Sequence, residues 1–500
     1  MKKNALAILA LVACALAGCT KPTSTASSDS TNPSSSSSTS TSFSGDDVTT
    51  AGAKEIQFWH CIGHEKMTNL KVIIDKFNDA HSKTDGYYVK AYQIAGEYTA
   101  LHDAVKTKLS AGFVPSITMG YPDSFAEYIG TNGADKSTIL NLESQIAADT
   151  TFDAAGMVPQ FYTEGQDYQY TGTWSVPLYK STEIMYYNKT MFEASAFYKA
   201  HKDETYGTYG AKLGDPKTWD WDTLVYVAGQ IQSENSGVSD FHALGYDSDA
   251  NLFISQMDQR SIPYTTKDGK GAGHFLFVDT ATGKANQALV DFTTNIYNLT
   301  KAGTMVTQGS YGTYASTLFK QKKVMFTVGS TAGSSYNEPN GAFQCGLAPV
   351  PCYQANKKQI MQGPSLCFFN TKDTAKEKAA WEFYSKYVSD AELNAGLSLE
   401  NSYDPVRTAS YETDGYKEYV SMGLTSAGED DITKELIYRI PSYTKNLKST
   451  YMTSPVFIGS STSRVEIGKL ISYTKENSGD VSAAIIKAYT NCVLASNENA

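Results

Sequence analysis

The sequence predicts a two-lobed α/β protein, and three observations support this fold class. First, 500 residues are too many for one hydrophobic core, so at least two lobes are expected. Second, 41% apolar and 19% charged residues are typical of a globular chain. Third, residues 54–180 alternate short apolar runs with segments of helical periodicity. This alternation predicts an open, mostly parallel sheet with crossover helices.

The first 18 residues are typical of an export signal. Lys2 and Lys3 form a basic start, and the apolar stretch after them is too short to span a membrane. The stretch ends in Leu16-Ala17-Gly18-Cys19, which resembles the bacterial lipobox. The resemblance implies that Cys19 carries lipid and becomes the first residue of the mature chain. An ordinary signal peptide with a chance cysteine is the alternative.

Residues 19–53, which comprise the lipidated cysteine and the segment after it, are predicted to be a disordered tether. Ser and Thr occupy 20 of the 34 positions after Cys19, and the few apolar side chains cannot offset the entropy lost on ordering. A flexible chain of this length reaches roughly 30–35 Å. We therefore expect a folded body that is held near a membrane by its N-terminal lipid alone.

Between Glu55 and Met119 the periodicity predicts three strands and two helices. The predicted strands are residues 55–59, 87–92 and 116–119, and the predicted helices are residues 66–80 and 98–111. Ligands of such sheets bind beyond the carboxyl ends of the strands. One crevice is therefore expected to gather the residues that come after these ends, which are Trp59, His60, Glu65, Tyr98, Tyr121 and Asp123. For the tryptophans, a place in the core is an equal alternative.

Charge and cysteine content exclude several function classes. The net charge of −10 leaves no basic excess for nucleic acid or anionic lipid. The five cysteines after Cys19 contain no C-x-x-C motif, so buried thiols are expected, with a Cys345–Cys352 disulfide as the open alternative. The pair His60 and His64 lacks a second cluster of ligands. We therefore predict neither a metal site nor a cofactor.

Local patterns predict structure further along the chain. Asn188 is expected to cap a helix that comes after a strand. The glycine-rich run 268–273 lacks the spacing of a dinucleotide-binding loop and is expected to form a hairpin turn. Residues 324–328 form a predicted buried strand. The small residues after it, Gly329 and Ser330, would let backbone amides approach a ligand, and a purely structural role is an equal alternative.

Motifs of known catalytic sites are absent from the sequence. It contains no G-x-S-x-G elbow, no P-loop and no H-E-x-x-H motif, and no pair of carboxylates stands out for acid–base chemistry. The 34 tyrosines suit sugar recognition, because each ring offers an apolar platform and each hydroxyl a hydrogen bond. These features favour a binding protein over an enzyme.

Eight segments, in their order along the chain, resemble the extracellular solute-binding proteins (family 1) of bacterial ABC importers, in the group that captures sugars and glycerol 3-phosphate. The segments are Trp174–Pro177, Met185–Phe192, Asp215–Trp219, Phe319–Ser330, Ala348–Pro351, Gln362–Phe369, Ala379–Phe383 and Ser402–Arg407. The resemblance covers residues 54 to about 480. It implies a periplasmic-binding-protein-like fold of type II, in which a hinge joins two lobes around a ligand cleft. The expected lobes are residues 54–183 with 358–388, and residues 184–357 with 389–500.

This resemblance also implies a function. We expect an exported, lipid-anchored and monomeric protein on the periplasmic or extracellular face of the cell membrane. It would capture a small polar solute by hinge closure and deliver it to the permease subunits of the importer. A carbohydrate is the favoured solute, and glycerol 3-phosphate or a glycerophosphodiester is the alternative. Alternatives of other classes are a secreted glycoside hydrolase and a surface adhesin or sensor partner.

The resemblance and the motif positions add residues to the expected cleft. These are Trp174, Lys180, Ser181, Tyr246, Gly329, Ser330, Gly363, Tyr403, Arg407 and Arg464. Arg464 matches an arginine that comes after small polar residues late in the family's sequence. Its planar fork suits a phosphate, vicinal sugar hydroxyls or a neighbouring carboxylate, so a surface pair with Glu466 is the structural alternative.

Overall fold

The computed structural model describes residues 52–130, 132–423, 434–444 and 448–498, which belong to one compact unit. The predicted export signal, the lipidation at Cys19 and nearly all of the predicted tether lie outside the described residues. Within the described residues, no helix is long and apolar enough to cross a membrane.

The first of two five-stranded sheets contains the predicted N-terminal strands. Its order is β2 (Tyr88–Gln93), β1 (Glu55–His60), β3 (Ile117–Gly120), β17 (Ser365–Phe368) and β4 (Val176–Pro177). Strand β1 pairs in parallel with β2 and β3, as the alternating pattern predicts. Strand β17 runs antiparallel to both of its neighbours, so the sheet is mixed rather than mostly parallel. In the sequence, β17 comes after all five strands of the second sheet.

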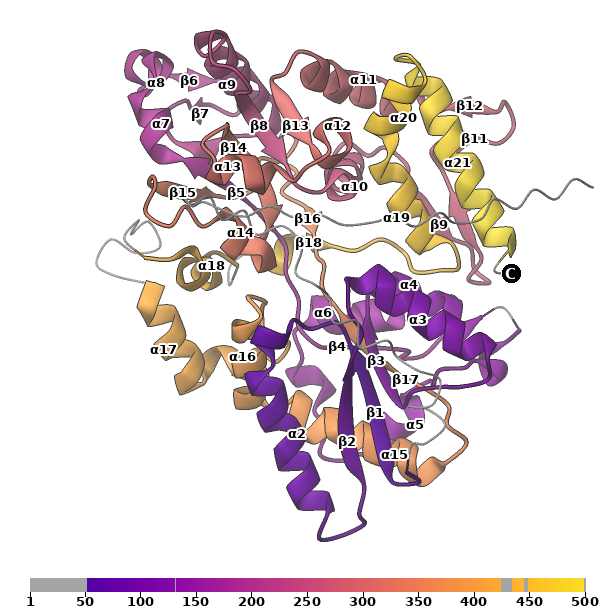
Figure 1. Cartoon of the computed structure of the whole chain (residues 1–500). Coiled ribbons are helices and arrows are strands. Elements are labelled where there is room, and N and C mark those ends of the chain that lie inside the picture. Colours follow the sequence, from indigo (N-terminus) through magenta and orange to yellow (C-terminus); the bar gives the residue numbers. More distant parts are fainter. Residues whose placement is uncertain (1–51, 131, 424–433, 445–447, 499–500) are drawn as a thin grey trace, which may run out of the picture. The chain divides into compact units, whose positions relative to one another are not determined.

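Helices cover this sheet as Figure 1 shows. α2 (Thr68–His81) packs against β2, α3 (Tyr98–Ser110) against β3, and α15 (Thr374–Phe383) against β1 and β17. The first two agree with the predicted helices to within two residues. The other α-helices that pack around the first sheet are α4 (Pro122–Ile129), α5 (Glu143–Ala148), α6 (Pro159–Thr163), α16 (Ala391–Glu400) and α17 (Asp414–Gly423).

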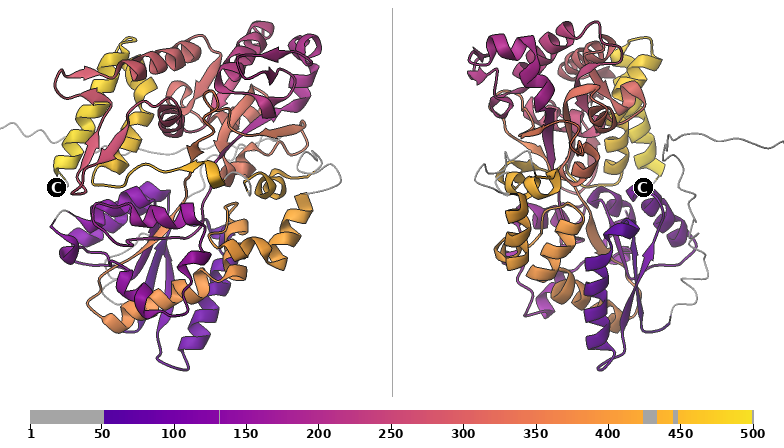
Figure 2. Two further views of the ribbon diagram at one scale, coloured as in Figure 1. Left: turned by 180° about the vertical axis from the view of Figure 1, so that it is seen from behind. Right: turned by 60° about the vertical axis from the view of Figure 1, so that its left-hand side comes forward.

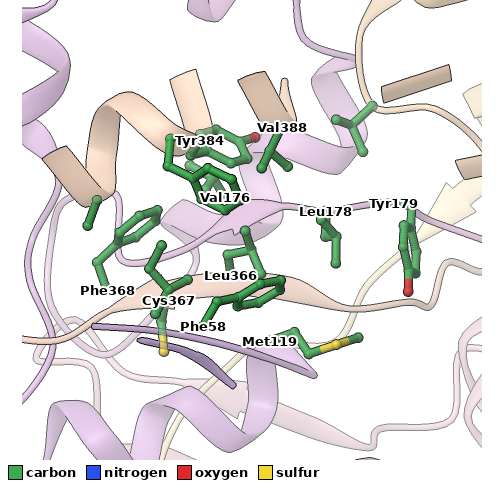
Figure 3. Close-up of a cluster of buried hydrophobic side chains, with 14 of the residues drawn as sticks. Phe58, Met119, Val176, Leu178, Tyr179, Leu366, Cys367, Phe368, Tyr384 and Val388 are labelled. Carbon is green, nitrogen blue, oxygen red and sulfur yellow. The ribbon is translucent and has the colours of Figure 1, made fainter. Parts of the chain in front are cut away.

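The central strands of this lobe are buried on both faces. Figure 3 shows Phe58 of β1 and Leu366 and Phe368 of β17 beside Tyr384, which comes directly after α15. All four belong to one core cluster and are at most 1% exposed. Burial on both faces favours apolar side chains, yet β1 also buries Glu55, Gln57 and His60.

The second sheet has the order β13 (Met305–Thr307), β8 (His242–Tyr246), β14 (Val324–Ser330), β5 (Glu183–Asn188) and β15 (Cys345–Ala348). Strand β14 confirms the buried strand predicted at residues 324–328. Strand β5 is buried on both faces: Met185 and Tyr187 pack in one core cluster, and Ile184 and Tyr186 pack in another. This division follows from the two-residue period of a strand.

The α-helices around the second sheet are α7 (Lys189–Ala194), α8 (Ala196–His201), α9 (Trp221–Glu234), α10 (Asp249–Gln259), α11 (Gln287–Lys301), α12 (Gln308–Tyr311), α13 (Ala315–Lys320), α14 (Ser334–Asn337), α18 (Leu436–Thr444), α19 (Ser460–Gly468), α20 (Leu470–Glu476) and α21 (Val481–Glu498). The last three, yellow in both views of Figure 2, pack against one another. The predicted cap of α7 is confirmed, because Asn188 Oδ1 accepts a hydrogen bond from Met191 N at 2.9 Å.

Short hairpins complete this part of the chain. β9 (Thr265–Lys267) and β10 (Gly273–Phe275) pair antiparallel, which confirms the hairpin predicted around residues 268–273. The remaining short pairs are β6 (Thr205–Tyr206) with β7 (Ala211–Lys212) and β11 (Val278–Asp279) with β12 (Lys284–Ala285).

The chain passes between the two sheets at residues 178–182 and again at residues 349–364, and these crossing segments lie side by side. Ser181 N donates to the Gln362 carbonyl at 2.7 Å, and Gln362 N donates to the Ser181 carbonyl at 2.9 Å. The second crossing segment includes β16 (Gln359–Ile360), which pairs in parallel with β18 (Tyr451–Met452). Hinges between domains consist of a few loop or element-terminal residues of this kind.

One expected lobe boundary differs from the packing. The sequence assigned residues 389–500 to the second lobe, yet the buried apolar residues from Ala395 to Tyr416 belong to the core cluster of the first sheet. The reason is that α16 packs directly against α2. We therefore propose that α16 and α17 belong to the first lobe, and the other boundaries stay as proposed.

The five cysteines after Cys19 are free thiols, so the alternative of a Cys345–Cys352 disulfide is not realised. Four of them are buried, as expected, and Cys61 is half-buried. Burial raises the pKa of the Cys345 thiol to about 12, which makes it unreactive at neutral pH.

Candidate functional site

A cavity of about 50 Å³ lies where segments of both sheets meet. The residues directly after β3 and Glu164 of the first lobe line one side of the cavity. Residues of α10, β9 and α19 line the other side. The polar residues around it are Tyr121, Asp123, Glu164, Tyr264, Thr265, Gln362, Thr453, Ser454, Ser460, Ser463 and Arg464. Three predicted site residues, Tyr121, Asp123 and Arg464, are therefore brought together.

The end of β3 places Tyr121 and Asp123 at the cavity. Pro122 begins α4, where its missing N–H removes no helical hydrogen bond and its ring favours the helical backbone. Asp123 lies in the first turn of the helix, and α4 packs against α19, the helix that carries Arg464. The strand end of one lobe and a helix of the other thus meet at the cavity.

Arg464 is the main cation of this cavity. One guanidinium nitrogen donates to Asn251 Oδ1 at 2.5 Å, and the guanidinium carbon lies 5.8 Å from the centroid of the Tyr121 ring. The predicted alternative, a surface pair with Glu466, is wrong. The Glu466 carboxylate instead accepts from the Lys469 ammonium at 2.6 Å.

Two carboxyl groups face the same cavity. Burial raises the pKa of both Asp123 and Glu164, and the positive charge of Arg464 opposes the rise at each. Asp123 is half-buried, whereas Glu164 is almost fully buried. The cavity therefore offers hydrogen-bond acceptors as well as the donors of Arg464.

Lys180 supports the cavity from behind. Its ammonium is fully buried and donates to the Glu164 carboxylate, to the Gly363 carbonyl at 2.9 Å and to Ser365 Oγ at 3.0 Å. These three bonds use all three donors of the ammonium group. Lys180 was predicted to bind solute, but in this structure it holds Glu164 in place instead.

A second buried polar network starts at Glu183, the first residue of β5. Tyr246 Oη donates to one Glu183 oxygen at 2.6 Å, and Asn251 Nδ2 donates to the other at 2.8 Å. Burial raises the pKa of Glu183 to about 7, although both hydrogen bonds favour the carboxylate. Tyr246, predicted to reach the solute, is 1% exposed and does not line the cavity.

Four tyrosines form a cluster that adjoins the cavity at Tyr121. The ring centroids of Tyr98 and Tyr121 are 4.6 Å apart, and those of Tyr179 and Tyr403 are 4.3 Å apart. The hydroxyl oxygens of Tyr98 and Tyr403 join the two pairs at 3.2 Å. Two further predicted residues, Tyr98 and Tyr403, are thereby connected to the site.

Five predicted residues lie elsewhere. Trp59 and Trp174 are fully buried in the first core cluster, so the core alternative is the one observed. His60 is 1% exposed, and burial lowers its pKa to about 4. Glu65 is exposed. The Arg407 guanidinium donates to the Asp153 carbonyl at 2.8 Å and lines none of the described cavities.

The predicted small residues lie along the crossings or at a strand end. Ser181 pairs with Gln362 through its backbone. Gly363 has φ of 121°, and a Cβ there would lie 2.8 Å from the Tyr179 carbonyl oxygen, so the crossing requires glycine. Gly329 and Ser330 end β14, where Ser330 Oγ accepts from Ala332 N at 3.2 Å. None of the four predicted small residues, which are Ser181, Gly329, Ser330 and Gly363, lines the cavity.

Several residues that line the cavity were not predicted from the sequence. Glu164 begins a three-residue 3-10 helix and Tyr264 lies outside regular elements, so no periodicity marks either residue. Gln362 and Ser463 were within reach, because they adjoin Gly363 and Arg464 in segments that had already been singled out. Among the described residues, no group of three or more His, Cys, Asp or Glu side chains is placed to hold a metal ion.

Comparison with known proteins gives consistent findings. The family model described as bacterial extracellular solute-binding protein matches residues 73–423. The sn-glycerol-3-phosphate-binding periplasmic protein of Pectobacterium atrosepticum is 24% identical over 416 residues, which cover 80% of this chain and 84% of that protein. The protein of the same name from Yersinia pestis is 25% identical over 421 residues, covering 79% and 83%.

Solved structures share the fold. UgpB from Mycobacterium tuberculosis in complex with glycerophosphocholine has a TM-score of 0.63 at 16% identity, with 89% of this chain and 99% of that chain covered. An ABC substrate-binding protein from Listeria monocytogenes in complex with cycloalternan has a TM-score of 0.61 at 16% identity, with 88% and 97% covered. These similarities confirm the predicted two-lobed α/β fold.

Proposed function

The chain belongs to the bacterial extracellular solute-binding proteins, the binding subunits of ABC importers, and we propose that it captures a carbohydrate between its two lobes. Proteins of this family bind a solute and deliver it to a permease, and they are not enzymes. The residues that we propose for solute contact are Tyr121, Asp123, Glu164, Gln362 and Arg464.

The observation that carries the proposal is the mixed chemistry of the cavity. Asp123 and Glu164 present acceptors from the first lobe, and Arg464 presents donors from the second. Sugar hydroxyls donate and accept, so both sides can be satisfied by one neutral molecule. The tyrosine cluster that begins at Tyr121 adds apolar ring faces of the kind that sugars contact.

The size of the cavity supports capture by hinge closure. About 50 Å³ is room for one or two water molecules, whereas small-molecule sites commonly span about 300–1,000 Å³. A sugar can enter only if the lobes separate. The adjacent crossings at Ser181 and Gln362 are the segments about which we expect them to turn.

Glycerol 3-phosphate or a glycerophosphodiester is the alternative solute. The solutes named for the relatives favour it, and the planar fork of Arg464 suits a phosphate. The two carboxyl groups at Asp123 and Glu164 argue against it, because an anion would face them across the same cavity. A neutral sugar meets no such repulsion.

We further propose that the protein is exported, anchored by lipid at Cys19 and monomeric. The lipobox-like segment and the Ser/Thr-rich segment behind it support the anchor. A monomer suits the proposed task, since the binding protein must present one cleft to the permease. Under this proposal the membrane is touched only by the N-terminal lipid.

Calorimetric titration tests the solute. Wild type and Arg464→Ala are titrated with a panel of neutral mono- and oligosaccharides, with glycerol 3-phosphate and with glycerophosphocholine. We expect a neutral saccharide to bind wild type and to bind Arg464→Ala more weakly. Heat from the two phosphate compounds alone would establish the alternative, and hydrolysis of a bound saccharide would contradict a binding role altogether.

A further inference from the structure

The side chain of Asn251 joins groups from three parts of the fold. Its Nδ2 donates to Glu183 Oε1 at 2.8 Å and to Gln362 Oε1 at 3.0 Å, and its Oδ1 accepts from Arg464 at 2.5 Å. Asn251 is 2% exposed and lies in the first turn of α10, where its backbone N–H donates to the capping Ser248 Oγ at 3.2 Å. Every polar atom of the amide therefore has a protein partner.

These partners allow only one orientation of the amide. Two of them, Glu183 and Gln362, present oxygen acceptors, and the third, Arg464, presents N–H donors. A flipped amide would place oxygen against two oxygens and NH2 against the guanidinium. A buried amide in that state would lose all three hydrogen bonds and keep its desolvation cost.

The acceptors that orient Asn251 are themselves fixed at the hinge. Glu183 begins β5 directly after the first crossing, and Tyr246 Oη holds its second oxygen at 2.6 Å. Gln362 lies in the second crossing and pairs with Ser181 of the first. The amide is thus anchored on the second crossing and on the residue that directly follows the first, while Arg464 extends from α19.

We propose that Asn251 is a positioning residue for Arg464, and that Glu183 and Gln362 make the placement of this guanidinium depend on the two crossing segments. The role of Arg464 in solute contact rests on the proposed function. Arginine loses rotamer freedom when it is held, so a guanidinium that is already fixed costs a solute less to order. Movement at the crossings would shift the Glu183 and Gln362 oxygens that hold the Asn251 amide. Such a shift would release or fix the guanidinium of Arg464.

The first test needs no solute. Asn251→Leu keeps the approximate shape of the side chain and removes its hydrogen bonds. Its matched control is Gln256→Met on the same helix, because Gln256 Oε1 accepts from Arg260 Nε at 3.1 Å, and neither residue lines the cavity. The measured quantity is the rate at which phenylglyoxal modifies Arg464, followed by mass spectrometry with Arg407 as the internal reference.

We expect Asn251→Leu to speed modification of Arg464 several-fold and Gln256→Met to leave that rate unchanged. Glu183→Met is a second variant, which keeps most of the length of the side chain. It removes the acceptors of both Tyr246 and Asn251, so it should also release Arg464. Wild-type rates at Arg464 in both Asn251→Leu and Glu183→Met would overturn the proposal.

The second test measures binding of maltotriose and glycerol 3-phosphate by calorimetry. Loss of a hydrogen bond to a charged group should weaken binding about tenfold or more in Asn251→Leu. In the double variant with Arg464→Ala, the Asn251 substitution should add no further loss, whereas additive losses would refute a shared role. If wild type binds neither probe, the saccharide panel decides the proposed solute class, and the modification rates alone decide whether Asn251 positions Arg464.

Discussion

The buried pair of Lys180 and Glu164 permits a quantitative prediction. The Lys180 side chain is 0% exposed, that of Glu164 is 10% exposed, and the ammonium donates to this carboxylate and to two further oxygens. Lys180→Met keeps most of the length of the side chain and removes its charge. Breaking a buried pair from one side costs about 3–5 kcal/mol, because the remaining charge loses its partner. We expect a loss of this size in the free energy of unfolding at pH 8.

The sign of the pH dependence is set by Glu164. Burial raises the pKa of this carboxyl and Lys180 opposes the rise, so the pKa climbs further once the ammonium is gone. In the folded protein the lone carboxyl of Lys180→Met is therefore protonated, and neutral, to a greater extent at pH 5 than at pH 8. The loss of stability relative to wild type should be smaller at pH 5 than at pH 8.

The assay is urea unfolding monitored by circular dichroism at both pH values. The exposed pair Lys71–Asp75, with a distance of 2.6 Å between Nζ and Oδ2, provides the control. Lys71→Met should change stability by no more than about 0.5 kcal/mol. Adding Glu164→Gln to Lys180→Met should restore part of the loss. A loss below about 1 kcal/mol at pH 8, or no recovery in the double variant, would refute the reasoning.

Three further outcomes are expected. Lys267 of β9, in the second lobe, donates to the carbonyl and the carboxylate of Asp167 in the first, both at 2.6 Å. Lys267→Met removes these hydrogen bonds between the lobes and should speed solute dissociation about fivefold in stopped-flow measurements. An unchanged rate would show that the contact does not hold the lobes together. Burial raises the pKa of Glu183 from 4.5 to about 7, so the folded state binds the extra proton between these values. Stability should therefore fall by about 3 kcal/mol as pH rises from 4.5 to 8, and Glu183→Gln should remove this part of the slope in pH-dependent denaturation; the same slope in both proteins would exclude Glu183 as its source. Cys19→Ala should abolish metabolic labelling with lipid and leave the protein in the exported soluble fraction, and its retention on membranes would disprove the anchor.

Local patterns predicted the secondary structure up to Met119 and the strand β14. β-Branched and aromatic residues marked β1 and β3, because such side chains fit a pleated, buried sheet. Asn188 marked the start of α7, because a cap acts within one turn of the chain. The rule that ligands bind beyond strand ends also placed Tyr121 and Asp123 at the cavity, since β3 ends directly before them.

The same rule was wrong for Trp59 and His60, which are buried in the first lobe. They are the last two residues of β1. Whether neighbouring elements cover the end of a strand depends on tertiary packing, which the sequence of the strand does not show. Resemblance to the solute-binding family singled out Arg464 but also Arg407, which the fold directs to the Asp153 carbonyl. Only the path of the chain in space distinguishes these two arginines.

The sequence predicted the fold class, the strands and helices up to Met119, the strand β14, the family and the arginine of the candidate site, because each depends on short-range patterns or on order along the chain. The tertiary structure alone decided which polar groups meet. Asn251 is 68 residues from Glu183 and 111 from Gln362, yet one amide binds both. Such contacts form when the two crossing segments and the first turn of α10 pack together, because every buried donor must find an acceptor. Periodicity and spacing along the chain do not predict them.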